Sequence, residues 1–261
     1  MNPLAVVTGA SQGLGFAFAQ RLAAEGLRPV LIARSAARLG DAAAQIARES
    51  GIEPLVMSAD VADAAALGRI AADVRASGAP LAWLVCNAGI VRTGTVEHMA
   101  AEDIAAQVRT NLLGAMLAAR AFMPLMAAGS RVLFVSSGFG LMGPAGYAAY
   151  SASKAGMITF AEAVRREVHA RKIGVYVAVP ADIDTPGHTN EMASAPEWMR
   201  RAAARGPLLS AEAAAARILR GCRGGRFVVY SDLSVRALAL ATRVLPRRLR
   251  DWSIDRLFPR P

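Results

Sequence analysis

The feature that most constrains the fold of this chain is a regular alternation of short apolar runs with longer Ala-rich segments of helical period. The short runs are rich in β-branched residues, and each is followed by enough chain for a helical crossover. Such alternation is typical of an α/β fold, a doubly wound parallel sheet with helices on both faces. The pattern predicts strands at residues 4–8, 29–33, 54–58, 81–86, 131–136, 174–179 and 226–230. It predicts helices at residues 13–25, 35–50, 63–77, 102–127, 150–171 and 210–221.

Two segments depart from this rhythm and define the expected domain organisation. Residues 181–207 are polar and irregular, and their length suits a lid over a binding site. Residues 232–261 form a basic, amphipathic C-terminal extension. No linker or repeat divides the rest, so we expect one domain over residues 1–231, and a hydrophobic fraction of 54% is ample for its core.

The charge and the cysteines exclude several classes of protein. The formal net charge is +10, carried almost wholly by arginine, because lysine occurs only at Lys154 and Lys172. The arginines are spread along the chain without a long run, so no nucleic-acid binding is expected. Cys86 and Cys222 lie far apart without metal-type spacing, which predicts no metal site and a reduced, cytoplasmic compartment. The chain opens without a secretory pattern, and its apolar stretches are too interrupted for a transmembrane helix.

A glycine-rich turn, TGASQGLG, follows the first predicted strand. Glycines at the start of a helix let the backbone approach a pyrophosphate, which the helix N-terminal N–H groups can bind. The spacing differs from the general dinucleotide fingerprint, and a tight turn without a ligand is the alternative. The expected cofactor-binding residues of this turn are Gly9, Ser11, Gln12, Gly13, Leu14 and Gly15.

The end of the second predicted strand bears on which dinucleotide binds. Arg34 occupies the position where an NAD-preferring site would carry an acidic residue for the ribose hydroxyl. Together with Ser35 and Arg38 it suits a 2′-phosphate, which favours NADP(H) over NAD; a solvated arginine at a helix start is the alternative. Asp60, followed by Val61, comes after the third predicted strand, where it would contact the adenine edge or cap the next helix.

Two tyrosines, Tyr147 and Tyr150, lie near the start of the helix predicted at residues 150–171, and only Tyr150 has a cation one turn further on, at Lys154. A nearby ammonium favours the phenolate and lowers the pKa of a tyrosine, so Tyr150 is a candidate proton donor to a carbonyl oxygen. Ser136 and Ser137 end the preceding strand, and alternation lets only one of them face the crevice.

Asn111 places an amide inside an otherwise apolar predicted helix, where it needs a partner.

Over residues 4–230 the chain resembles a short-chain dehydrogenase/reductase. The residues that carry the resemblance are the TGASQGLG turn, Asn87, Ala88, Gly89, Asn111, Ser137, Tyr150 and Lys154.

This resemblance implies a single Rossmann-type domain and an NADP-dependent oxidoreductase acting on a CH–OH or C=O group. It implies that Tyr150 is the general acid/base, that Ser137 orients the substrate carbonyl, and that Lys154 lowers the pKa of Tyr150 and holds the nicotinamide ribose. Asn111 would carry a water-linked proton relay through Lys154, and Asn87 would stabilise the sheet beside the cofactor. The hydride itself comes from the nicotinamide.

After the sixth predicted strand the family pattern continues with one departure. Pro180, Ile183 and Thr185 match positions near the carboxamide and phosphates of the cofactor, whereas Ala181 replaces a glycine. The backbone at Ala181 is therefore expected to need no positive φ.

The lid segment resembles that of 3-ketodihydrosphingosine reductases, which reduce a long-chain 3-keto amine with NADPH. The resemblance implies an NADPH-dependent ketoreductase acting on 3-ketodihydrosphingosine or a similar long-chain lipid ketone. Asp182 and Asp184 would attract the substrate ammonium, or else cap loop N–H groups. Met192, Trp198 and Met199 would contact the alkyl chain, or else pack the lid. The alternatives are a 3-oxoacyl-thioester reductase, another alcohol dehydrogenase of the family, and a cofactor-binding protein without turnover.

The C-terminal extension carries seven arginines and two aspartates among apolar residues over residues 234–261. This composition suits peripheral contact with an anionic membrane surface; an arm that closes an oligomer is the alternative. The expected location is the cytoplasm, including the inner face of a membrane. The family habit of pairing through helices implies a homodimer or homotetramer.

Overall fold

The alternating pattern folds into a parallel sheet with helices on both faces, as the sequence predicts. In the computed structural model, which describes residues 1–203 and 208–257, seven strands pair in the order β3-β2-β1-β4-β5-β6-β9. Their bounds are β1 (Leu4–Thr8), β2 (Arg28–Ala33), β3 (Leu55–Ser58), β4 (Leu81–Cys86), β5 (Met126–Val135), β6 (Gly174–Val179) and β9 (Val228–Tyr230). All neighbouring pairs in this sheet are parallel. The strand order reverses between β1 and β4, and such a reversal creates a ligand crevice at the carboxyl ends of the strands.

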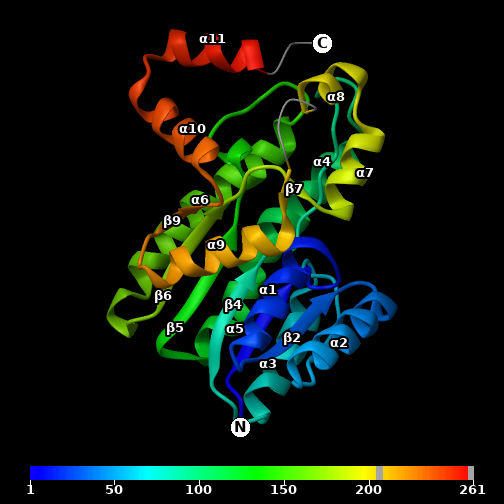
Figure 1. The fold of residues 1–261 in the computed structure, drawn as a ribbon, viewed down its shortest axis with the longest axis vertical. Helices are drawn as coiled ribbons and strands as arrows, with labels where there is room; N and C mark the ends of the chain where they lie inside the picture. The colour runs from blue at the N-terminus through cyan, green and yellow to red at the C-terminus, as the bar shows by residue number, and fades with distance from the viewer. Residues whose placement is uncertain (204–207, 258–261) are drawn as a thin grey trace.

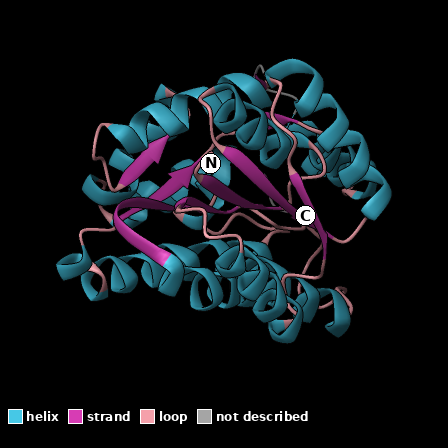
Figure 2. Cartoon of the chain, turned by 90° about the horizontal axis from the view of Figure 1, so that it is seen from below, coloured by secondary structure: helices cyan, strands magenta, loops and turns pink. Residues whose placement is uncertain are grey.

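Two sets of helices cover the two faces of the sheet (Figures 1 and 2). One set is α1 (Gly13–Ala24), α2 (Ala36–Ser50) and α9 (Ala211–Arg223); the other is α3 (Ala64–Ala76), α5 (Gly114–Phe122) and α6 (Ala148–Glu167), which a 3-10 turn η4 (His169–Arg171) follows. Successive residues of each strand point to opposite faces, so Val6 packs in one core layer and Val7 in the other. Burial on both faces explains why the strands are continuous apolar runs.

The helix predicted at residues 102–127 is interrupted by a π-helical turn and ends before residue 127. The chain instead forms α4 (Ala101–Gln107), a π-helical turn η1 (Val108–Leu113), α5, and a 3-10 turn η2 (Met123–Leu125). Pro124 lacks an N–H group and cannot continue a helix, so the chain turns there and β5 already begins at Met126 rather than at residue 131. The π-helical turn contains Asn111, and such turns occur frequently at functional sites.

The segment after β6 is helical, which corrects the expectation of an irregular lid over residues 181–207. A two-residue strand β7 (Ile183–Asp184) pairs with β8 (Leu209–Ser210), and between them lie α7 (Pro186–Ser194) and α8 (Glu197–Ala203). Thr185 starts α7, because its hydroxyl oxygen accepts a hydrogen bond from the N–H of His188 at 3.2 Å. Residues 204–207 of the expected lid lie outside the described part of the chain. The φ of Ala181 is not positive, as expected.

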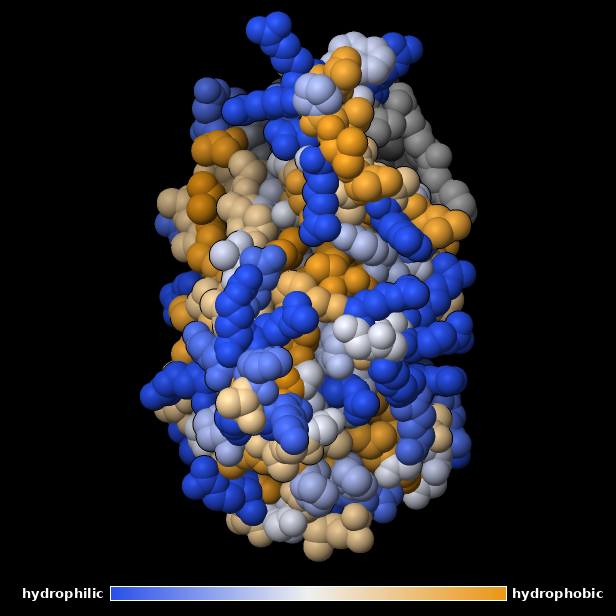
Figure 3. Space-filling model, turned by 90° about the vertical axis from the view of Figure 1, so that its left-hand side faces the viewer, coloured by the Kyte–Doolittle hydropathy of each residue, from blue (hydrophilic) through white to orange (hydrophobic). Residues whose placement is uncertain are grey.

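The C-terminal extension forms two helices, α10 (Leu233–Val244) and α11 (Arg247–Leu257), at the upper left of Figure 1. Within α10, Val235 and Ala239 are buried against the domain. Leu240 and Trp252 are 63% and 59% exposed. Figure 3 shows one side of the molecule, and at its top apolar side chains are bordered by hydrophilic ones. In the part of the chain that the structure describes, no helix is both long and apolar enough to cross a membrane.

Candidate active site

A cleft of about 540 Å³ opens at the carboxyl ends of the strands, where the strand order reverses. Every residue predicted to bind the cofactor lines this cleft: Gly9, Ser11, Gln12, Gly13, Leu14, Gly15, Arg34, Ser35, Arg38, Asp60, Val61, Asn87, Ala88, Gly89, Tyr150, Lys154, Pro180, Ile183 and Thr185. Ser137 and Asp182 also line it, whereas Asn111, Asp184, Met192 and Trp198 are not part of its wall. The cleft therefore unites segments that are far apart in the sequence.

The glycine turn has the shape that a pyrophosphate requires. Gly9 and Gly13 have φ values of +67° and +57°, which other residues rarely adopt. A Cβ atom on Gly15 would lie 2.2 Å from the carbonyl oxygen of Gly9, so the start of α1 packs directly on the turn. The N-terminus of α1 has no side-chain cap, whereas Ser35 caps α2 and Asp63 caps α3. The first N–H groups of α1 are thus available to an anion in the cleft.

Hydrogen bonds tie the glycine turn to the loop after β4. The Thr8 hydroxyl oxygen accepts from the N–H groups of Asn87 at 3.0 Å and Ala88 at 3.1 Å. The Asn87 amide nitrogen donates to the carbonyl oxygens of Thr8 at 3.1 Å and Gly9 at 3.4 Å. Asn87 therefore braces the turn from the side.

Two exposed guanidinium groups line the cleft at the end of β2, where an NAD site would hold a carboxylate. These are Arg34 and Arg38, and Arg38 Nη1 donates to Gln12 Oε1 at 3.1 Å. The Ser35 hydroxyl oxygen accepts from the N–H of Arg38 at 3.4 Å, so Ser35 also serves as the cap of α2.

Asp60 lines the cleft but does not cap the next helix. Its carboxylate accepts from the N–H of Ala62 at 2.9 Å, and the cap of α3 is Asp63. Of the two roles considered for Asp60, the structure excludes the helix cap.

Tyr150 and Lys154 lie on the same side of α6, as their spacing predicts, and Ser137 reaches the cleft from the end of β5. Lys154 is only 4% exposed, and its Nζ donates to the carbonyl oxygen of Val135 at 2.8 Å. Burial lowers the pKa of Lys154 to about 8. The Nζ atom lies 5.7 Å from the centre of the Tyr150 ring. The three side chains therefore share a sheltered corner of the cleft.

Burial dominates the surroundings of the Tyr150 phenol, so the expected lowering of its pKa by Lys154 stays a prediction. Burial raises the pKa of Tyr150 above its ordinary value, and the hydrogen bond with Ser137 lowers it by less. The charges of Glu191 and Asp182 raise the pKa of Tyr150 further. The phenol is consequently protonated at neutral pH, which is the form that donates a proton to a carbonyl oxygen.

Ser136 has a structural role. Its hydroxyl donates to the carbonyl oxygen of Lys154 at 2.8 Å and so fastens α6 to the end of β5. Ser137 is the serine that is hydrogen-bonded to Tyr150, which agrees with the expectation that one of the two faces the reacting groups.

Asn111 is fully buried behind the cleft wall. Its Oδ1 accepts from the N–H of Ile90 at 2.7 Å, and its Nδ2 donates to the Ile90 carbonyl oxygen at 2.9 Å and to Ser153 Oγ at 3.1 Å. A Cβ atom on Gly89 would lie 3.4 Å from both Asn111 Oδ1 and Lys154 Nζ. The amide and the ammonium therefore approach the same small space, although they are not bonded to each other.

Glu191, on α7, is the main cleft residue that the sequence did not reveal. It lines the cleft, and its Oε1 accepts a hydrogen bond from the Tyr147 hydroxyl at 2.6 Å. Burial raises the pKa of Tyr147, and the adjacent charge of Glu191 raises it further. Tyr147 thus binds the lid rather than a reacting group. A lone acid in a polar segment carried no spacing signal that could have identified this pair.

The remaining predicted substrate contacts divide into two groups. Met192, Trp198 and Met199 belong to an apolar cluster with Tyr147 and Tyr150, beside the cleft. Asp184 is exposed and outside the cleft wall, which corrects its assignment as a substrate contact.

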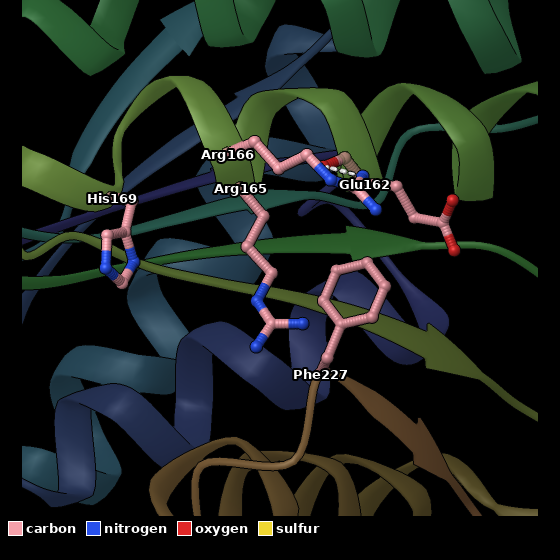
Figure 4. A pocket seen from close by; sticks show the side chains of 5 residues that line it. All are labelled: Glu162, Arg165, Arg166, His169 and Phe227. Atoms are coloured by element: carbon pink, nitrogen blue, oxygen red, sulfur yellow. Dashed lines mark hydrogen bonds between the residues drawn. The ribbon is translucent and has the colours of Figure 1, made fainter.

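A second hollow lies at the opposite edge of the sheet, between α6 and the residue that precedes β9 (Figure 4). The Arg165 guanidinium lies over the Phe227 ring, 4.9 Å from its centre, and Arg166 Nη1 donates to the carbonyl oxygen of Glu162 at 2.8 Å.

The fold and the cleft define a nicotinamide-dependent oxidoreductase, because a dinucleotide cradle adjoins a half-buried tyrosine and a buried lysine. The sequence profile of the family described as short chain dehydrogenase matches residues 3–195, and the chain belongs to this family.

Relatives and solved structures extend the comparison. The 3-dehydrosphinganine reductase TSC10A of Arabidopsis thaliana is 34% identical over 253 residues, which cover 95% of this chain and 76% of that relative. A 3-oxoacyl-[acyl-carrier-protein] reductase of Homo sapiens is 35% identical over 187 residues, which cover 71% of this chain and 77% of that protein. A short chain dehydrogenase/reductase of Burkholderia phymatum, solved in complex with NAD, is 25% identical and matches with a TM-score of 0.82 over 100% of this chain and 97% of its own.

Proposed function

We propose that this enzyme uses NADPH to reduce the ketone of a long-chain amino ketone such as 3-dehydrosphinganine, which is also called 3-ketodihydrosphingosine. The observation that carries the proposal is the single cleft in which Tyr150 and Ser137 adjoin both the dinucleotide cradle and the lid. The similarity to the Arabidopsis 3-dehydrosphinganine reductase extends over 95% of this chain, the lid included, and supports this substrate class.

The cofactor preference follows from the charges at the end of β2. Arg34 and Arg38 line the cleft and are exposed, so their guanidinium groups can reach a ribose 2′-phosphate. The glycine turn and the uncapped start of α1 would hold the pyrophosphate, and Lys154 would hold the nicotinamide ribose.

When bound, the nicotinamide supplies the hydride that the carbonyl carbon accepts. Tyr150 donates its proton to the carbonyl oxygen, and Ser137 orients that oxygen through its own hydroxyl. Lys154, which is protonated below its pKa of about 8, lies close enough to return a proton to Tyr150 through water. Asn111 fixes the loop beside Lys154 and would order that water.

A second candidate is reduction of a 3-oxoacyl thioester. The observation in its favour is the 35% identity to the human 3-oxoacyl-[acyl-carrier-protein] reductase, although that match covers 71% of this chain. A non-catalytic role has less support, because a protein without turnover would have no need for a buried lysine beside Tyr150.

The C-terminal helices suit peripheral contact of a cytoplasmic protein with the anionic inner face of a membrane. Leu240, Val244 and Trp252 are exposed apolar side chains on α10 and α11, among arginines of the same helices. A membrane-dissolved substrate would explain such a surface. Exposed Val108 and Leu113 beside α5 are suited to a contact between two copies in a homodimer or homotetramer.

The proposed function is tested by NADPH absorbance with 3-dehydrosphinganine in detergent micelles, with a 3-oxoacyl thioester in a parallel reaction. Consumption of the amino ketone at a higher kcat/KM than the thioester supports the proposal. Consumption of the thioester alone would replace it with the second candidate.

A further inference from the structure

The cleft wall at residues 90–92 is held by two buried amides, of which the sequence pattern revealed only Asn111. The other is Gln107, the last residue of α4, and its side chain is fully buried. Its Oε1 accepts a hydrogen bond from the N–H of Arg92 at 3.0 Å, and its Nε2 donates to the carbonyl oxygen of Asp103 at 3.3 Å. Gln107 therefore joins the cleft wall to the helix that contains it.

The two amides hold alternate residues of this wall. Asn111 binds the N–H and the carbonyl oxygen of Ile90, at 2.7 Å and 2.9 Å, whereas Gln107 binds the next residue but one. Val91 lies between them in the chain, and it packs on the same apolar cluster as Tyr150. The backbone is thus fixed on both sides of the residue that adjoins the reacting groups.

The Gln107 amide is the stronger of two attachments between Arg92 and α4. The other is an ion pair of Arg92 Nε with Asp103 Oδ1 at 3.3 Å, and these side chains are 52% and 45% exposed. Exposed ion pairs contribute little to stability, whereas a peptide N–H that is sheltered from water needs an acceptor. Without the amide, that N–H would lack its acceptor, and this end of the wall would shift.

The dinucleotide cradle does not depend on this attachment. Asn87 and the Thr8 hydroxyl brace the glycine turn, and neither is hydrogen-bonded to Gln107. A shift in residues 90–92 would therefore disturb the apolar cluster beside Tyr150 and leave the glycine turn in place. The consequence falls on the reacting groups rather than on the affinity for the cofactor.

We propose that Gln107 is a positioning residue for the reduction, which acts through Arg92 and Val91 on the wall that faces the substrate beside Tyr150. Its role is to keep the substrate carbonyl in line with the phenol, so it contributes to kcat and not to NADPH binding. The inference rests on the proposed function in that a carbonyl is reduced at Tyr150, and it holds for either candidate substrate.

The test measures kcat, KM and the NADPH dissociation constant with 3-dehydrosphinganine and, in parallel, with a 3-oxoacyl thioester. Gln107→Met keeps the length of the side chain and loses both hydrogen bonds, whereas Gln107→Glu keeps an oxygen that can accept from Arg92. Asp103→Asn removes only the exposed ion pair. Ile70→Val trims a buried side chain of α3 outside the cleft wall and is the control for lost thermal stability.

We expect Gln107→Met to lose at least about tenfold in kcat with unchanged NADPH affinity, because a small displacement around a reacting group can cost up to about a hundredfold. Gln107→Glu should recover most of that kcat. Asp103→Asn and Ile70→Val should keep the kcat of wild type.

Val91→Ala reaches the same wall by a second route, and it shortens a half-buried side chain, so it should fold even if Gln107→Met does not. It should lower kcat, and in a double-mutant cycle its loss and that of Gln107→Met should not add, because both act through the same contact. Additive losses, a wild-type kcat in Val91→Ala, or equal losses in Gln107→Met and Gln107→Glu would overturn the proposal. If wild type reduces the thioester but not the amino ketone, the proposed substrate fails, and the same comparison on the thioester still decides the role of Gln107.

Discussion

Replacement of Gly15 by alanine would place a methyl group where the glycine turn has no room. The new Cβ atom would lie 2.2 Å from the Gly9 carbonyl oxygen and 2.5 Å from the Asn87 amide nitrogen. The first obstacle is backbone, which cannot rotate aside as a flexible side chain would, so the turn or the start of α1 must shift. Overpacking of this kind costs about 1–3 kcal/mol, and the short distance to backbone places Gly15→Ala near about 3 kcal/mol.

The matched control is Gly68→Ala, because Gly68 lies in α3 and a Cβ atom there would meet nothing within 4 Å. The control should gain about 0.5–1 kcal/mol, since alanine is the better helix former. At about 2–4 °C per kcal/mol, thermal unfolding should show a loss of roughly 6–12 °C for Gly15→Ala and a small gain for Gly68→Ala. Fluorescence titration should show weaker NADPH binding for Gly15→Ala alone. An unchanged melting temperature and NADPH affinity in Gly15→Ala would refute this account of the cradle.

Three further predictions concern the cofactor, the buried lysine and the C-terminal helices. Arg34→Asp should shift the kcat/KM preference from NADPH toward NADH by about 1–3 kcal/mol, and an unchanged ratio would place the 2′-phosphate elsewhere. The pKa of Lys154 is lowered to about 8, below the value of an unfolded lysine, so the unfolded state binds more protons above pH 8. The contribution of Lys154 to the free energy of unfolding should therefore rise by about 2 kcal/mol from pH 8 to pH 10. Denaturant unfolding of Lys154→Met should lack that rise. An equal pH dependence of the free energy of unfolding in wild type and Lys154→Met would contradict this prediction. The double variant Leu240→Glu with Trp252→Glu should bind anionic vesicles at least about tenfold more weakly without loss of thermal stability, because both side chains are exposed. Equal co-sedimentation of the variant and wild type with the vesicles would exclude this surface as the membrane contact.

The sheet could be predicted because a strand buried on both faces is written in the sequence as a continuous apolar run. The prediction failed where the signal is not periodic: Pro124 ends the helical stretch after α5, and β5 begins in a segment that lacks a β-branched run. The lid was expected to be irregular because its composition is polar, yet Thr185 caps a helix there. Short exposed helices have weak apolar patterns, so composition alone cannot distinguish them from loops.

The cofactor cradle could be predicted because its residues are local, either in one turn or at strand ends. Tyr150 and Lys154 could be paired because they are one helical turn apart. Glu191 could not be found, since its partner Tyr147 is 44 residues away in the sequence and meets it only when α7 folds over α6. The direction of the Tyr150 pKa shift was also beyond the sequence, because it depends on burial and on that same unpredicted carboxylate.

The most direct test of the central claim is NADPH consumption with 3-dehydrosphinganine in micelles by wild type, Tyr150→Phe and Tyr147→Phe. The two variants each remove one phenol hydroxyl from neighbouring rings, 6.3 Å apart. We expect Tyr150→Phe to lose at least about a hundredfold in kcat, the scale of general acid catalysis, whereas Tyr147→Phe should retain most of its activity. Equal activity in wild type and Tyr150→Phe, or loss in Tyr147→Phe alone, would contradict the assignment of Tyr150 as the proton donor.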